Sequence, residues 1–171
     1  METKEKIIST LRGTGRENIE KVIAYMEKGF FDAPASVVHH NNFRGGLAKH
    51  SLEVYEEAMK LNEISAMPKD SITLCALLHD ICKADQYFMS EDDKPKSDGE
   101  KLKKGHGLRS VYILTRRCEL PLNYDEVMAI WWHMGEHERS KSQYEKEYRD
   151  STGVELCKLI QEADSIAAKI E

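Results

Sequence analysis

The sequence predicts an all-α fold, with the helices gathered in a single-domain bundle. Apolar residues recur at intervals of three and four, as on one face of a helix, and the alternating runs typical of strands are nearly absent. The 171 residues are the size of one compact domain. With no internal repeat and no linker-like segment, we expect one domain over residues 1–171.

The first two expected helices are amphipathic. Residues 16–28 carry apolar side chains at helical spacing: Ile19, Val22, Ile23 and Met26. Residues 47–62 carry a second such series: Leu47, Val54, Ala58 and Leu61. This pattern predicts that each helix turns one face towards the core.

The third expected helix, residues 70–83, contains the most apolar stretch of the chain, SITLCALLHDIC. It follows Pro68, and Asp70 or Ser71 could cap its first turn. We therefore expect a buried helix.

Three further helices are expected in the second half of the chain, at residues 107–118, 123–134 and 154–170. Asn123 is followed three residues later by Glu126, the spacing of a capping box. The last helix has one broad apolar face: Leu156, Leu159, Ile160, Ala163, Ile166, Ala167 and Ile170.

Two segments differ from these helices. Residues 90–104 are polar and contain Pro and Gly, which predicts a loop. Residues 138–150 lack an aliphatic stripe, which predicts a solvated loop or helix.

Composition limits the classes of function. The net charge is −5 with acids and bases interspersed, which argues against broad electrostatic binding of nucleic acid. No apolar run is long enough to cross a bilayer, and the first residues lack the apolar stretch of a secretion signal, so we expect a cytoplasmic protein with no membrane partner. The four cysteines show no CxxC spacing and are interpreted as small apolar fillers: Cys75, Cys82, Cys118 and Cys157.

The informative residues are polar groups on apolar faces. His79 and Asp80 interrupt the most apolar helix, His50 lies on the inward stripe of residues 47–62, and Asp164 lies on the packing face of the last helix. Each alone has a simpler explanation, such as a hydrogen-bonded core histidine or a carboxylate paired with an arginine. Together, imidazole and carboxylate form a ligand set suited to Mn, Fe, Zn or Co if the helices converge.

These residues resemble a known family. The segments FRGGLAKHSLEV, LLHDICK and EADSIAA are similar to the three motifs of the HD-domain superfamily of metal-dependent phosphohydrolases, in the same order. The resemblance extends from about residue 38 to 168. It implies a helical bundle with metal ligands at its centre.

The resemblance also implies the ligand set. By position, one metal ion would be held by four residues: His50, His79, Asp80 and Asp164. Some branches of the superfamily bind a second ion through two further histidines, here His106 and His133, with Asp80 bridging both ions. His137 shares a helical face with His133 only if the helix continues past Gly135. We therefore expect one or two divalent ions, Mn, Fe or similar.

Such a site implies hydrolysis of a phosphomonoester, phosphodiester or phosphoanhydride by a metal-activated water. Asp80 would orient the water, Lys83 could bind a phosphate oxygen, and Arg44 could clamp phosphate bidentately. The alternatives are that Lys83 is a solvated helix end and Arg44 a surface residue. Cys82 replaces the glycine usual before the lysine, and nothing in the sequence marks it as a nucleophile.

The expected substrate is small, phosphorylated and nucleotide-like. The GGL-x-x-H segment resembles that of a branch of the superfamily that includes a 3′-to-5′ exoribonuclease. However, these 171 residues contain no all-β module, and their net charge is negative. Both observations disfavour a long nucleic acid as the substrate. His39 and His40 could line the pocket mouth, and Trp131 and Trp132 are expected in the core rather than stacked on a base. Two alternatives stay open: a non-catalytic, metal-containing nucleotide-binding or regulatory module, and a helical interaction protein without metal. The sequence leaves the oligomeric state undefined.

Overall fold

Helices form nearly all of the regular structure, which confirms the all-α prediction. The computed structural model describes residues 2–99, 105–138 and 140–169. The helices are α1 (Thr3–Gly13), α2 (Ile19–Met26), α3 (Gly46–Ser65), α4 (Lys69–Leu78), α5 (His106–Tyr112), α6 (Tyr124–Trp131), α7 (Glu145–Ser151) and α8 (Glu155–Ala167). Short 3₁₀ turns span Ile81–Ala84 and Gly135–His137, and a π-helical turn, Ile113–Arg117, extends α5.

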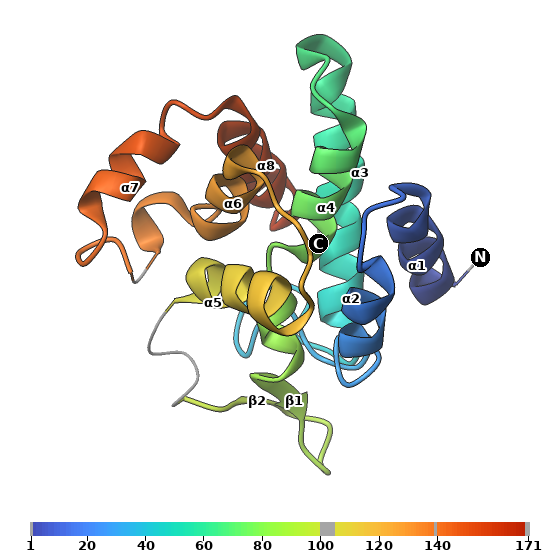
Figure 1. Ribbon diagram of the computed structural model, residues 1–171. Coiled ribbons are helices and arrows are strands. Elements are labelled where there is room, and N and C mark those ends of the chain that lie inside the picture. Colours follow the sequence, from blue (N-terminus) through green and yellow to red (C-terminus); the bar gives the residue numbers. More distant parts are fainter. Residues whose placement is uncertain (1, 100–104, 139, 170–171) are drawn as a thin grey trace.

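Helices α3 and α4 form the centre of the bundle. A three-residue connection joins them, and they run side by side in opposite directions (Figure 1). Helix α8 packs against α3 and α6, α5 packs against α6, and α1 covers the other side of α3 (Figure 1). The ends of α3, α4, α6 and α8 carry the polar residues that the sequence singled out.

Helix α4 is buried on every side. All residues from Ser71 to Leu78 are buried, as expected of a helix that is apolar around its whole circumference. The helix ends at Leu78, so the expected range of 70–83 was too long. Asp80 leaves the helical path at φ −107°, and the 3₁₀ turn follows it. The His-Asp pair thus lies at the end of a helix, where its side chains are less constrained by helical spacing.

Helix α6 begins as the sequence predicted. The Asn123 side chain accepts a hydrogen bond from the Glu126 amide, and the Glu126 carboxylate accepts one from the Asn123 amide, which confirms the capping box. The other expected helices are also present, with ends shifted by a few residues. Residue 170, the expected end of the last helix, lies outside the described residues.

The sequence interpretation missed two elements. Helix α1 buries only Ile7 and Leu11, a pair too short to stand out as a periodic pattern. A small antiparallel hairpin pairs β1 (Tyr87–Met89) with β2 (Pro95–Ser97), inside the segment expected to be a loop. Its strands are shorter than the runs of four to eight residues by which strands are recognised. Residues 100–104 of the expected loop lie outside the described residues.

Polar segment 138–150 contains α7 at its end, in agreement with the predicted loop or helix; its residue 139 lies outside the described residues. All four cysteines are buried and unpaired, which confirms their place in the core. Among the described residues, no helix is both long and apolar enough to span a membrane.

Candidate metal centre

His50 and Asp164 meet where α3 packs against α8. The Nε2 atom of His50 lies 3.0 Å from Oδ1 of Asp164. His50 is brought to this place by the turn that begins α3, in which Gly45 adopts φ +80°. A Cβ atom on Gly46 would overlap the Asn41 carbonyl oxygen, so the turn requires glycine at this position.

His79 and Asp80 join this pair from the end of α4. The Nδ1 atom of His79 lies 2.8 Å from the Ala76 carbonyl oxygen. A carbonyl can only accept, so Nδ1 carries a proton, and in the neutral ring the free lone pair is on Nε2. That Nε2 lies 3.4 Å from Oδ2 of Asp80 and 3.9 Å from Oδ1 of Asp164. The backbone therefore fixes the tautomer that a metal ligand requires.

His133 repeats this arrangement at the end of α6. Its Nδ1 donates to the Ile130 carbonyl at 2.7 Å, and its Nε2 lies 3.5 Å from Oδ1 of Asp80. The rings of His79 and His133 meet edge to face, with centroids 4.8 Å apart. Two histidines that follow different helices thus direct their Nε2 atoms towards the same carboxylate.

Several polar atoms at this convergence lack a hydrogen-bond partner. They include His79 Nε2, Asp80 Oδ1 and His133 Nε2, all fully buried. Burial of an unsatisfied polar atom costs about 1–3 kcal/mol, and more for a charged group. Three such atoms facing one another fit the place of a cation, because a bound ion would satisfy all of them. The donor set, imidazole and carboxylate, fits a divalent transition metal.

The remaining predicted ligand, His106, is the first residue of α5. Its Nδ1 lies 3.6 Å from Sγ of Cys82. Ligand atoms within 4.8 Å of one another form three overlapping groups: His50, His79 and Asp80; His79, His133 and Asp164; and Asp80, Cys82 and His106. All six predicted ligands therefore lie in one cluster, and Cys82 lies beside them.

Lys83 also belongs to this cluster. Its Nζ lies 2.6 Å from Oδ2 of Asp80, and its side chain is only 11% exposed. Burial opposes the charge of each group, yet the Lys83 ammonium and the neighbouring histidines lower the pKa of Asp80 well below its usual value. Conversely, Asp80 outweighs burial and raises the pKa of Lys83. The pair is therefore charged at neutral pH.

Neighbouring groups also favour the charged forms of Asp164 and His133. Although burial would raise the pKa of Asp164, the hydrogen bond from His50 and the charges of nearby histidines lower it. Burial would lower the pKa of His133, but its contact with Asp80 raises it. The cluster thus keeps two carboxylates ionised inside the protein, as a cation site needs.

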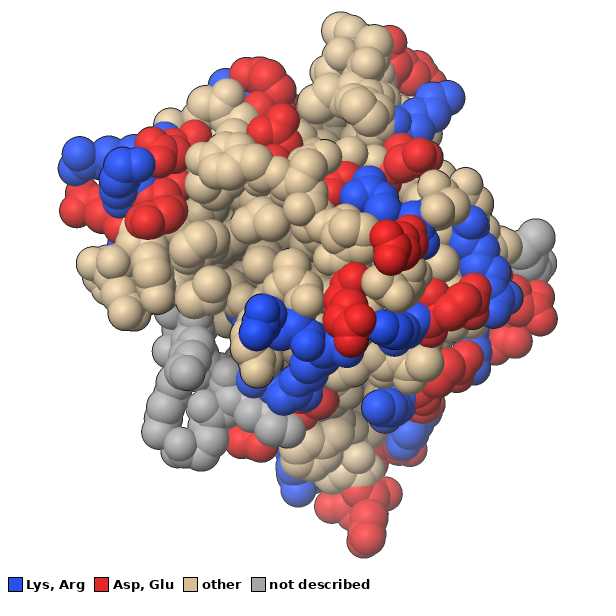
Figure 2. Space-filling model, viewed as in Figure 1, with Lys and Arg blue, Asp and Glu red and all other residues tan. Residues whose placement is uncertain are grey.

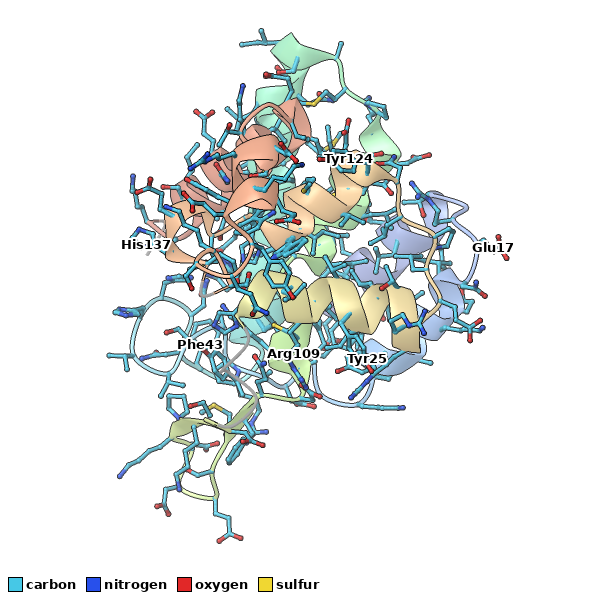
Figure 3. The ribbon with its side chains drawn as sticks, turned by 60° about the vertical axis from the view of Figure 1, so that its left-hand side comes forward. Glu17, Tyr25, Phe43, Arg109, Tyr124 and His137 are labelled. Carbon is cyan, nitrogen blue, oxygen red and sulfur yellow. The ribbon has the colours of Figure 1, made fainter. Side chains whose placement is uncertain are left out.

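A cavity of about 450 Å³ opens above these residues. Six members of the cluster line it, together with residues from the surrounding loops, turns and α8. The cluster members are His50, Asp80, Lys83, His106, His133 and Asp164; the others include His39, His40, Tyr87, Met134, His137, Gln161 and Ser165. The ring of His40 packs on that of His50, with centroids 4.8 Å apart. Figure 3 shows the labelled His137 and Phe43 on the same side of the molecule; His137 lines this cavity, and Phe43 lines a second cavity that shares His39 and His40 with it.

Gln161 is a cavity residue that the sequence interpretation missed. Its Nε2 donates to the Trp132 carbonyl at 2.7 Å and thereby ties α8 to the end of α6. The available signal was its position three residues before Asp164, on the same face of the last helix. The bond holds Asp164 and His133 in register across two helices.

Arg44 is not brought into the cavity lining. Its guanidinium lies 3.0 Å from Asp93 in the β1–β2 turn, and both side chains are exposed. Binding of phosphate by Arg44 stays a prediction, and it would require this pair to open. Trp132 is fully buried, as expected for a core residue, and stacks on Trp131, which is partly buried against the core.

Comparisons with known proteins agree with this geometry. A family model described as the HD domain matches residues 47–169. The dihydroneopterin 2′,3′-cyclic phosphate phosphodiesterase of Methanocaldococcus jannaschii is 36% identical over 67 residues, 36% of this chain and 27% of that protein. The 3′-5′ exoribonuclease YhaM of Geobacillus sp. (strain WCH70) is 32% identical over 84 residues, 46% of this chain and 26% of that protein. The matches span about a quarter of each relative, and no solved structure matches significantly.

Proposed function

Because the chain belongs to the HD domain family, we propose that it is a metal-dependent phosphohydrolase acting on a small, nucleotide-like phosphate ester or anhydride. The observation that carries this proposal is the set of unsatisfied buried atoms on His79, Asp80 and His133, of which Asp80 and His133 line a cavity. A structural core would not keep such atoms without a partner.

The proposed metal ligands divide into two overlapping sets. The first ion would be held by His50, His79, Asp80 and Asp164, and the second by Asp80, His106 and His133. Divalent ions bound there would neutralise phosphate oxygens and lower the pKa of a water molecule towards about 7. Mn, Fe or similar divalent ions are those that we propose, in keeping with a mixed nitrogen and oxygen donor set.

Lys83 is the proposed phosphate-binding residue. Its ammonium is charged, lines the cavity and is held in place by Asp80. An ammonium has three donors, so one bond to Asp80 leaves the others for a phosphate oxygen. Asp80 in turn fixes the position of the reacting water. Arg44 is a second proposed phosphate ligand, subject to the opening of its pair with Asp93.

The cavity favours a small substrate. A volume of about 450 Å³ lies within the range of about 300–1,000 Å³ that is usual for small-molecule sites. The names of both relatives denote cleavage of phosphodiester bonds, which favours a phosphodiester over the other phosphate classes. We therefore propose a cyclic or linear nucleotide-like phosphodiester as the first substrate class to test.

The surface charge also favours a small substrate over a long nucleic acid. Figure 2 shows basic and acidic side chains intermixed on the face in view, without a continuous basic track for a nucleic acid backbone. The net charge of −5 agrees with this picture. We propose that long nucleic acids are not the substrate.

The test is a hydrolysis screen with protein loaded with Mn²⁺ or Fe²⁺. The panel contains 2′,3′- and 3′,5′-cyclic nucleotides, nucleoside mono- and triphosphates, short oligoribonucleotides and a chromogenic phosphodiester. We expect turnover of at least one small phosphodiester, lost in Asp80→Asn. Nucleotide binding without product, with two ions bound, would contradict hydrolysis and favour the regulatory alternative.

A further inference from the structure

Cys82 has surroundings unlike those of Cys75 and Cys157. The thiols of Cys75 and Cys157 face backbone carbonyls, those of Glu126 and Trp132. The Cys82 sulfur instead lies 3.6 Å from His106 Nδ1 and within 4.8 Å of an Asp80 carboxylate oxygen. Apolar packing accounts for its burial but not for the two ligand-type groups beside it.

The spacing of these atoms fits a shared ion. With Zn–S near 2.3 Å and Zn–N near 2.0–2.1 Å, a tetrahedral site places the two ligand atoms about 3.6 Å apart. The observed separation of the Cys82 sulfur and His106 Nδ1 is 3.6 Å. The side chains are thus already at the distance that a common metal would impose.

A second, independent observation points to an ion at this place. Asp80 Oδ1 and His133 Nε2 are fully buried, lie 3.5 Å apart and have no hydrogen-bond partner. Asp80 is also the carboxylate whose ligand atom lies within 4.8 Å of those of Cys82 and His106. Asp80 therefore adjoins three further potential donors: the sulfur of Cys82, a nitrogen of His106 and the Nε2 atom of His133.

The backbone around Cys82 is held by a buried hydroxyl. Its amide donates to Ser110 Oγ at 3.3 Å, and Ser110 is fully buried on α5, the helix that carries His106. The hydrogen bond couples the 3₁₀ turn of Cys82 to α5. Outer contacts of this kind fix the orientation of metal ligands.

We propose that Cys82 is a ligand of the second metal ion, together with Asp80, His106 and His133. The thiolate would make this subsite prefer borderline-soft ions such as Zn²⁺ over Mn²⁺ and Mg²⁺, because soft sulfur ligands select against hard ions. The inference rests on the proposed two-ion centre. It assigns a metal preference to the position where the resemblance leads one to expect glycine.

The experiment is a Co²⁺ titration of the metal-free full chain, followed by absorption spectroscopy. A cobalt–thiolate bond gives an intense near-ultraviolet charge-transfer band, which nitrogen and oxygen ligands do not give. We expect this band to develop with the second equivalent of Co²⁺. It should be absent in Cys82→Ala and Cys82→Gly and retained in Cys75→Ala, the matched buried control.

Competition between metals gives a second readout. Removal of the thiolate should weaken binding of the second Zn²⁺ by at least the roughly 10- to 100-fold seen when outer-shell partners are lost. The ratio of Zn²⁺ to Mn²⁺ bound from an equal mixture should fall in Cys82→Gly. An unchanged ratio would overturn the proposal.

The wild-type spectrum alone decides whether a thiolate binds the metal, even if a variant fails to fold. Uptake of two cobalt ions without the band would overturn the thiolate ligand, and so would failure to take up a second ion. Phosphodiester hydrolysis, measured on the same samples, separates the two proposals. Hydrolysis without the band would support the proposed phosphohydrolase activity and reject Cys82 as a metal ligand. The band without hydrolysis would support Cys82 as a metal ligand and reject the phosphohydrolase activity.

Discussion

The ammonium of Lys83 lies 2.6 Å from Oδ2 of Asp80, while Oδ1 of the same carboxylate faces His133 at 3.5 Å without a hydrogen-bond partner. One oxygen is thus satisfied by the protein and the other is not. This asymmetry makes Asp80 the residue on which both the proposed metal centre and the proposed phosphate site depend.

Replacement of Lys83 by methionine should lower kcat/KM without emptying the metal centre. A hydrogen bond to a charged group is worth about 1.5–3 kcal/mol, so the loss should be about 10- to 150-fold. Steady-state kinetics and metal analysis check this result together. Lys60→Met removes an exposed lysine of α3 and serves as the control. Unchanged kcat/KM in Lys83→Met would exclude Lys83 as a phosphate ligand.

Asp80→Asn should remove most of the bound metal and reduce hydrolysis on the order of a thousandfold or more. The amide is neutral and bridges two cations poorly, although its shape is the same. Elemental analysis after equilibrium dialysis gives the metal content. Asp125→Asn, an exposed acid in the first turn of α6, should keep both metal and activity. A fully metallated Asp80→Asn protein would argue against the bridging role.

Gly46→Ala should destabilise the fold at the turn that positions His50. Its Cβ would overlap the Asn41 carbonyl oxygen, and such overpacking costs about 1–3 kcal/mol. For a chain of this size, that corresponds to a fall in Tm of roughly 2–12 °C. Gly13→Ala is the matched control, because no atom lies within 4 Å of its Cβ position. It should leave Tm unchanged or raise it slightly. Equal Tm values for the two variants would contradict the close approach.

Glu126 should contribute to the acid sensitivity of the fold. Burial would raise its pKa, but the bidentate bond from Arg16 and the hydroxyl of Ser71 lower it below 4.5. The folded chain therefore binds fewer protons here than the unfolded chain does, and stability falls as pH drops below about 4.5 towards the folded pKa.

Glu126→Gln tests this relationship by urea unfolding between pH 3 and 7. The variant should lose about 3–5 kcal/mol at pH 7, because Arg16 is left without its partner. Its free energy of unfolding should then depend less on pH between about 5 and 3 than that of the wild type. Equal slopes in that window would show that Glu126 does not carry the dependence.

The sequence identified the residues of the proposed metal centre more readily than the features that surround them. His50, His79, Asp80 and Asp164 were visible because polar groups on apolar faces are rare, and their order resembles a known family. Their convergence depends on the packing of α3, α4 and α8, which periodicity alone does not determine.

Other features depend on contacts between distant segments. Arg16 and Glu126 are 110 residues apart, and Arg44 meets Asp93 only because a short hairpin folds beside it. The proximity of Cys82 to His106 requires the placement of α5 against the 3₁₀ turn. In each case the local pattern is compatible with an ordinary surface or core residue.

The most direct test of the central claim is phosphodiester hydrolysis by one preparation, measured after chelation and again after addition of Mn²⁺ or Fe²⁺. The proposed function predicts that chelation abolishes turnover, that metal restores it in the wild type, and that it is not restored in Asp80→Asn. Chelation should also lower Tm, since a ligand at a hundred times its Kd adds about 2.7 kcal/mol of stability. Turnover that persists in metal-free protein, or equally in Asp80→Asn, would contradict the claim that this cluster is a metal-dependent active site.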